Sequence, residues 1–165
     1  AYAEIGSKTI EPGEVLTFMN QRLQDLADER FVTAFYGVIH RRSRRFVYAN
    51  AGHPFPLHWS ARRGCCQTLA ARGFLLGISP DEVYREGSVD LEPGDRLLFY
   101  TDGGPDTRND LGECFGVDRL RESFEGLPAD TDASAALNHL TDQMSGFRGT
   151  QRPTDDTTLI VAHVR

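Results

Sequence analysis

The sequence is poor in cysteine. It has three, Cys65, Cys66 and Cys114, and the adjacent pair does not have the spacing of zinc ligands. A small, odd number of cysteines also does not suit a framework of disulfides. We therefore expect structural thiols in a reducing, cytoplasmic setting.

Long apolar runs are missing as well, and none approaches the roughly 20 residues that a membrane-spanning helix needs. The chain contains no GxGxxG, Walker or CxxC motif. Residues 1–14 lack the basic and apolar regions of a signal peptide, and the sequence does not start with Met. These absences indicate a protein without a membrane segment, and we expect the sequence to be a piece of a longer chain.

An excess of basic residues is also absent. The 165 residues include 18 Lys and Arg against 24 Asp and Glu, a formal net charge of −6. This balance argues against binding to nucleic acid or to a membrane surface, and favours a cation or a protein as partner. With 39% hydrophobic residues the chain is long enough for a real core, so we expect one domain over residues 1–165.

Hydrophobic periodicity predicts strands in the first part of the chain and helices after them. We expect a nearly unbroken apolar strand at 31–39 to be buried on both faces and to form a hairpin with the next strand. The expected strands are 31–39, 45–51, 56–60, 66–70, 83–91, 95–100 and 157–164, and the expected helices are 12–28, 116–126 and 132–147. This order indicates an α+β fold with antiparallel sheets.

Acidic residues gather where one strand ends and another begins. Asp102 follows the strand at 95–100, and Asp155 and Asp156 precede the last strand. If these strands are antiparallel neighbours, the carboxylates share one edge of the sheet and can hold a hard divalent cation such as Mg²⁺ or Mn²⁺. Such an ion activates water and suits phosphoryl transfer. Taken singly, each acidic residue is also typical of an ordinary turn or cap.

One other interpretation of these acidic residues competes with the metal site. Asp102, Asp106, Asp110 and Glu113 match ligand positions of an EF-hand calcium loop, but Thr107 stands where that loop needs glycine, and a strand precedes it. His58, in contrast, lies in a strand pattern without clustered ligands, so we expect it to be a surface or packing residue.

Six spaced blocks of the sequence match one family pattern in order. The blocks are FVTAFYGVI, RFVYANAGHPFPL, GFLLGI, VDLEPGDRLLFYTDG, GECFGVDRL and DDTTLIV. Together they resemble the bacterial branch of the PP2C-type (PPM) serine/threonine phosphatases, the SpoIIE- and RsbU-like enzymes. The resemblance implies an antiparallel β-sandwich flanked by helices, with two Mn²⁺ or Mg²⁺ ions at one edge.

The resemblance also implies roles for individual residues. Asp102 and Asp155 match the family's metal-binding and catalytic aspartates, and Gly103 matches the glycine that lets the chain turn away from the metal. Asp156 and Asp106 are expected beside these ligands. The implied activity is hydrolysis of phosphoserine or phosphothreonine on a bacterial regulatory protein of the anti-anti-sigma-factor type, by metal-activated water and without a phosphoenzyme.

The sequence departs from the family pattern in two places. The family's earlier block, an Asp followed by Gly-His-Gly, is missing, so we expect the domain to lack its first strands and a principal metal ligand. The loop after Gly103 reads Gly104, Pro105, Asp106, where relatives carry an apolar residue and a Glu. The alternative is therefore a non-catalytic phosphatase fold that binds a regulator. Exposed sheet edges would favour a homodimer or aggregates.

Overall fold

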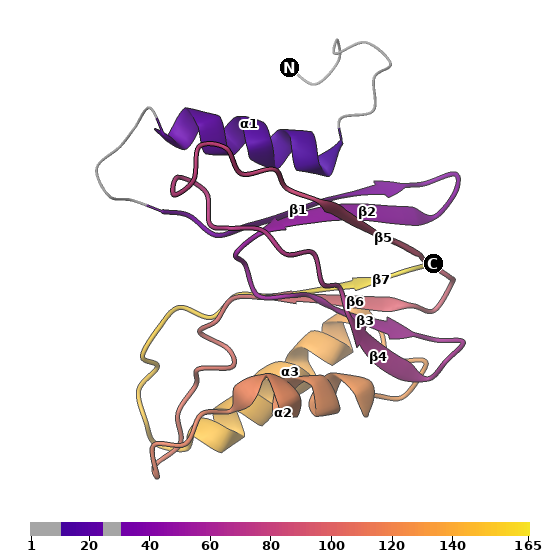
Figure 1. The fold of residues 1–165 in the computed structure, drawn as a ribbon. Helices are drawn as coiled ribbons and strands as arrows, with labels where there is room; N and C mark the ends of the chain where they lie inside the picture. The colour runs from indigo at the N-terminus through magenta and orange to yellow at the C-terminus, as the bar shows by residue number, and fades with distance from the viewer. Residues whose placement is uncertain (1–10, 25–30) are drawn as a thin grey trace. The chain divides into compact units, whose positions relative to one another are not determined.

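A computed structural model describes residues 11–24 and 31–165 of the chain (Figure 1). The described residues form two compact units, each with its own sheet. The first comprises the described residues up to His53 together with Ala70–Asp90, and the second comprises Pro54–Leu69 and Leu91–Arg165. No helix in the described part of the chain combines the length and apolarity needed to cross a membrane.

The first unit joins one helix to a three-stranded antiparallel sheet. Its elements are α1 (Pro12–Gln24), β1 (Ala34–His40), β2 (Arg45–Ala51) and β5 (Glu86–Asp90), with the strands in the order β1-β2-β5. The predicted hairpin is present, since β1 and β2 pair from Ala34↔Ala51 to His40↔Arg45. α1 begins at Pro12 as expected, whereas its expected end at Asp28 lies outside the described residues.

The prediction that the first strand is buried on both faces is wrong. β1 is an edge strand of its sheet, and Tyr36 and Ile39 are 37% and 47% exposed. Phe31 and Val32, just before it, are 62% and 44% exposed. A continuous apolar run is typical of a buried strand, but the run itself does not say whether neighbours cover both faces.

The second unit has a four-stranded antiparallel sheet and two helices. The strands, in the order β4-β3-β6-β7, are β4 (Cys65–Thr68), β3 (Leu57–Ser60), β6 (Arg96–Tyr100) and β7 (Leu159–His163), and the helices are α2 (Gly116–Glu125) and α3 (Ala133–Arg148). The second predicted hairpin is β3 and β4. The turn before Arg96 does not close a hairpin, because β5 and β6 belong to different sheets. Two antiparallel sheets and separate helices confirm the predicted α+β class.

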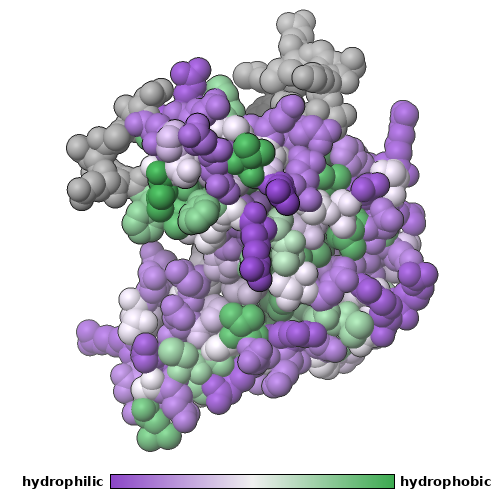
Figure 2. Space-filling model, in the orientation of Figure 1, coloured by the Kyte–Doolittle hydropathy of each residue, from purple (hydrophilic) through white to green (hydrophobic). Residues whose placement is uncertain are grey.

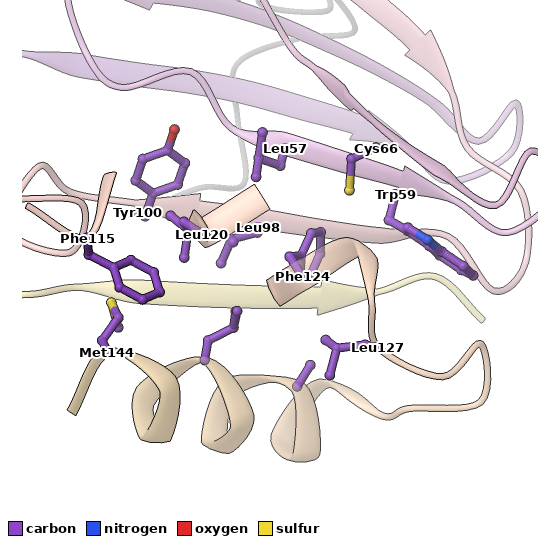
Figure 3. Packing of buried hydrophobic residues seen from close by; sticks show 12 residues of the cluster. Leu57, Trp59, Cys66, Leu98, Tyr100, Phe115, Leu120, Phe124, Leu127 and Met144 are labelled. Carbon is purple, nitrogen blue, oxygen red and sulfur yellow. The ribbon is translucent and has the colours of Figure 1, made fainter. Parts of the chain in front are cut away.

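The core of the second unit lies between its sheet and its helices, where strand and helix side chains point toward one another (Figure 3). It comprises Leu57, Trp59, Cys66, Leu98, Tyr100, Phe115, Leu120, Phe124, Leu127, Ala136, Leu140 and Met144. The periodicity of α3 predicts Ala136, Leu137, Leu140 and Met144 on one face, and the structure buries Ala136, Leu140 and Met144 and half-buries Leu137. Polar residues predominate on the face drawn in Figure 2, where apolar residues lie in separate patches.

Arg96 places a cation inside this core. Its guanidinium lies 4.1 Å from the centre of the Trp59 ring and 5.7 Å from that of Phe124. It donates hydrogen bonds to the carbonyl oxygens of Pro128 (2.9 Å) and Leu127 (3.3 Å). Burial lowers the pKa of Arg96. Aromatic faces and carbonyl oxygens thus replace water around the charge and fasten the segment after α2 to the sheet.

His58 is a buried packing residue with an acidic partner. Its Nε2 lies 2.7 Å from Oδ2 of Asp95, and its Nδ1 lies 2.8 Å from Nε2 of Gln67. The Asp95 carboxylate also accepts hydrogen bonds from the backbone N–H groups of Ala61 (2.8 Å) and Glu92 (3.0 Å). These bonds tie β3 to the turn that leads into β6.

Candidate functional site

The end of β6 and the beginning of β7 meet at one edge of the second unit's sheet. The two strands pair antiparallel up to Tyr100↔Leu159. Beyond this pair, the N–H of Thr101 donates to the carbonyl oxygen of Thr158 (3.1 Å), and the N–H of Thr158 donates to Oγ1 of Thr101 (3.0 Å). The segment that carries Asp102 therefore runs beside the segment that carries Asp155 and Asp156. We call these two segments the acidic corner.

Gly103 allows the two segments of the acidic corner to approach each other closely. A Cβ at this position would collide with the carbonyl group of Asp156 and lie 3.4 Å from Oγ1 of Thr157. Gly103 is not among the residues with positive φ, so it is needed for close approach and not for a left-handed turn. A Cβ at Gly104 would meet its neighbours at 3.5 Å or more, which is ordinary contact.

The carboxylates of the acidic corner face solvent. Asp102, Asp155 and Asp156 are all exposed. One oxygen of Asp102 accepts from the N–H of Gly103 (3.1 Å), and one of Asp155 accepts from the N–H of Asp156 (2.7 Å). Asp106 is also exposed, and its N–H donates to the carbonyl oxygen of Asp102 (2.9 Å), one turn along the loop. The structure thus brings Asp102 beside the segment with Asp155, as the sequence predicts.

The donor chemistry of the acidic corner suits a hard divalent cation. Mg²⁺ is commonly held by one or two carboxylates and keeps several waters, and exposed carboxylates leave room for them. Among the described residues, however, no three acidic, histidine or cysteine side chains are grouped as a metal would require. Asp102 and Asp155 could hold such an ion, but they do not form a closed set of ligands.

The calcium-loop interpretation is wrong. The acidic residues after Asp106 have partners within the protein: Asp110 accepts hydrogen bonds from Thr150 (3.1 Å) and Gln151 (2.9 Å), which follow α3. Glu113 accepts from the side chain of Asn109 (2.8 Å). These bonds occupy carboxylate oxygens that an EF-hand would use for calcium, and the element before the loop is a strand.

A groove of about 310 Å³ lies next to the acidic corner within the second unit. The residues that line it are Thr107, Leu137, Thr141, Met144, Ser145, Arg148, Thr157 and Leu159. No pattern in the sequence predicted this groove. Arg148 is the last residue of α3. Basic residues are common in the last turn of a helix, so its place in the sequence does not indicate a binding site.

Comparison with known proteins identifies the family. A model of the family described as Stage II sporulation protein E (SpoIIE) matches residues 1–165. Phosphoserine phosphatase RsbU of Bacillus subtilis (strain 168) is 33% identical over 104 residues, which are 62% of this chain and 31% of RsbU. The chain thus spans less than a third of that relative.

Solved structures agree with this match. The SiaA-PP2C domain of Pseudomonas aeruginosa has a TM-score of 0.81 and 21% identity, and the match covers 98% of this chain and 63% of that one. The phosphatase domain of SpoIIE from Bacillus subtilis, presoaked with Mn, has a TM-score of 0.65 and 17% identity, with 98% and 77% covered. These likenesses establish a PP2C fold and confirm the resemblance seen in the sequence. The chain belongs to the SpoIIE family of PP2C-like domains.

Proposed function

We propose that the chain is a metal-dependent protein serine/threonine phosphatase domain. The observation that carries this proposal is the acidic corner, where Asp102 lies beside the segment of Asp155 and Asp156 across paired strands. The similarity to a phosphoserine phosphatase supports the reaction type. We further propose that the substrate is a phosphorylated bacterial regulatory protein of the anti-anti-sigma-factor type, encountered in the cytoplasm.

Asp102 and Asp155 would hold Mn²⁺ or Mg²⁺, two ions by analogy with the family, and Asp106 and Asp156 flank them. When bound, such ions lower the pKa of water and offset the charge on the phosphoryl oxygens. Gly103 lets the two aspartate segments approach each other closely. Water attacks phosphorus, the bond from phosphorus to the serine oxygen breaks, and phosphate and the serine hydroxyl are released.

The test is phosphate release from a phosphoserine peptide in the presence of Mn²⁺. Loss of a ligand charge removes several kcal/mol of stabilisation, so Asp102→Asn should lower the rate by on the order of 100-fold. Asp130→Asn is the matched control, since Asp130 is exposed and lies outside the acidic corner. Equal rates for the wild type and Asp102→Asn would refute the proposed activity.

A second candidate is a phosphatase fold that binds a regulator without turnover. The observation in its favour is that no group of three potential ligands exists among the described residues. Calorimetric titration with Mn²⁺ separates the two candidates. Binding that Asp102→Asn abolishes supports the enzyme, and a titration without heat of binding supports the binding module.

A further inference from the structure

The groove beside the acidic corner combines an apolar surface with hydrogen-bonding groups. Leu137, Met144 and Leu159 supply the apolar part. Hydroxyl groups come from Thr107, Thr141, Ser145 and Thr157, and Arg148 supplies the single charged side chain among the lining residues. A surface of this composition suits an extended polypeptide segment, which offers both apolar side chains and polar groups.

The fold leaves most of the Arg148 guanidinium unused. The side chain is half-buried, and its Nη2 donates only a long hydrogen bond, 3.4 Å, to Oγ of Ser145. Its Nε is enclosed without a partner. No carboxylate within the described ranges forms an ion pair with it. A guanidinium has five donors in a planar fork that matches a carboxylate, so Arg148 is available for an acidic group.

The groove is adjacent to the acidic corner but distinct from it. Thr157 lines the groove and directly follows Asp156 in the chain. Thr107 also lines it and donates its hydroxyl to the carbonyl oxygen of Gly103 (3.1 Å). Neither Asp102 nor Asp155 lines the groove. A group held by Arg148 therefore lies to one side of a phosphoryl group bound at the corner.

We propose that this groove binds the substrate segment next to the phosphorylated residue, and that Arg148 pairs with an Asp or Glu side chain of that segment. The proposal rests on the proposed phosphatase function and makes Arg148 a specificity-determining residue. With a net charge of −6 the chain as a whole repels acidic partners. A local cation in an otherwise uncharged groove therefore favours substrates whose acidic residue lies at the position that reaches Arg148.

The experiment compares two phosphoserine peptides of equal length, one with Glu beside the phosphoserine and one with Gln there. Para-nitrophenyl phosphate serves as a substrate without flanking residues. The full chain is assayed with Mn²⁺ as wild type, Arg148→Gln and Arg148→Lys. Arg152→Gln is the matched control, because Arg152 is exposed and does not line the groove. Thermal melting verifies that each variant is folded.

We expect Arg148→Gln to raise KM for the Glu peptide by about tenfold, the usual scale for one charge-assisted pair. Its constants for the Gln peptide and para-nitrophenyl phosphate should equal those of the wild type. Arg148→Lys should recover part of the loss, because it keeps the charge without the fork. Arg152→Gln should behave as wild type with all three substrates.

Three results would overturn the proposal. The first is an unchanged KM of Arg148→Gln for the Glu peptide, and the second is an equal loss on all three substrates, which would place Arg148 on the phosphoryl group. If the wild type hydrolyses none of the substrates, the proposed function fails and the groove is tested separately. Fluorescence anisotropy with the labelled Glu peptide then decides: weaker binding by Arg148→Gln supports the groove, and equal binding is the third refuting result.

Discussion

Gly103 controls how closely two chain segments approach. Its position allows no Cβ, because the carbonyl group of Asp156 occupies that space. Backbone atoms cannot rotate away as a flexible side chain can, so Gly103→Ala must push the segment of Asp156 outward. We expect a loss of about 1–3 kcal/mol in the free energy of unfolding, the usual cost of overpacking. Urea denaturation measures this loss.

The neighbouring glycine provides the control for this prediction. A Cβ at Gly104 makes only ordinary contacts, at 3.5 Å from Sδ of Met144. Gly104→Ala should therefore leave stability within about 0.5 kcal/mol of the wild type. Phosphate release should fall for Gly103→Ala and not for Gly104→Ala. Equal stability and equal phosphate release for the two variants would contradict this prediction, because the segment of Asp156 would then move away without a loss of stability.

The buried thiol of Cys66 should make the stability of the protein depend on pH in the alkaline range. Burial raises the pKa of its thiol from 9.0 to about 12. The unfolded chain loses this proton near pH 9 while the folded chain keeps it, so stability is present below pH 9 and declines as the pH rises toward 12. One proton corresponds to about 1.4 kcal/mol per pH unit.

Urea unfolding between pH 8 and pH 11 measures this slope. Cys66→Ala should lose stability with pH less steeply than the wild type, by roughly one proton. Cys114→Ala is the control, because it removes an exposed cysteine instead of a buried one. Tyr84 and Tyr100, whose pKa values burial also raises, contribute equally in all three proteins. Parallel slopes for the wild type and Cys66→Ala would contradict the assignment.

At the scale of secondary structure, the sequence predicts the features that depend on residues close together in the chain. The two hairpins, β1 with β2 and β3 with β4, follow from apolar runs separated by short turns. The buried stripe of α3 follows from the spacing of Ala136, Leu140 and Met144. The exposure of β1 does not follow, because it depends on which strands come to lie beside it.

The start of α3 gives a prediction at this scale. Asp132 is its N-cap, and one carboxylate oxygen accepts from the N–H of Ala135 at 2.7 Å. Asp132→Ala leaves that N–H without its partner and should destabilise the second unit by about 1 kcal/mol. Asp130→Ala is the control, since Asp130 is exposed and outside the helix. Chemical denaturation of both variants measures the difference, and equal stability would contradict the capping role.

At the scale of the whole chain, the sequence predicts some contacts between distant residues and misses others. The pairing of β6 with β7 was expected, because both acidic segments adjoin strong strand signals and match family blocks. The contact between His58 and Asp95 was not expected, since His58 lies outside the matched blocks and no spacing in the sequence links it to Asp95. Arg148 was missed for the same reason: its importance comes from the groove, which residues from α3, β7 and two loops create together.

Self-association is the prediction that concerns the whole molecule. Within the described residues, β1 pairs only with β2 along its length, and it includes the exposed residues Tyr36 and Ile39. An edge with free backbone groups and apolar side chains pairs readily with another strand. We expect dimers or larger species by light scattering, and fewer of them for Ile39→Lys, because a charge at an edge opposes pairing. Val117→Lys introduces the same charge at an exposed position of α2 and should leave association unchanged. A wild-type protein that scatters as a monomer at all concentrations would refute association through this edge.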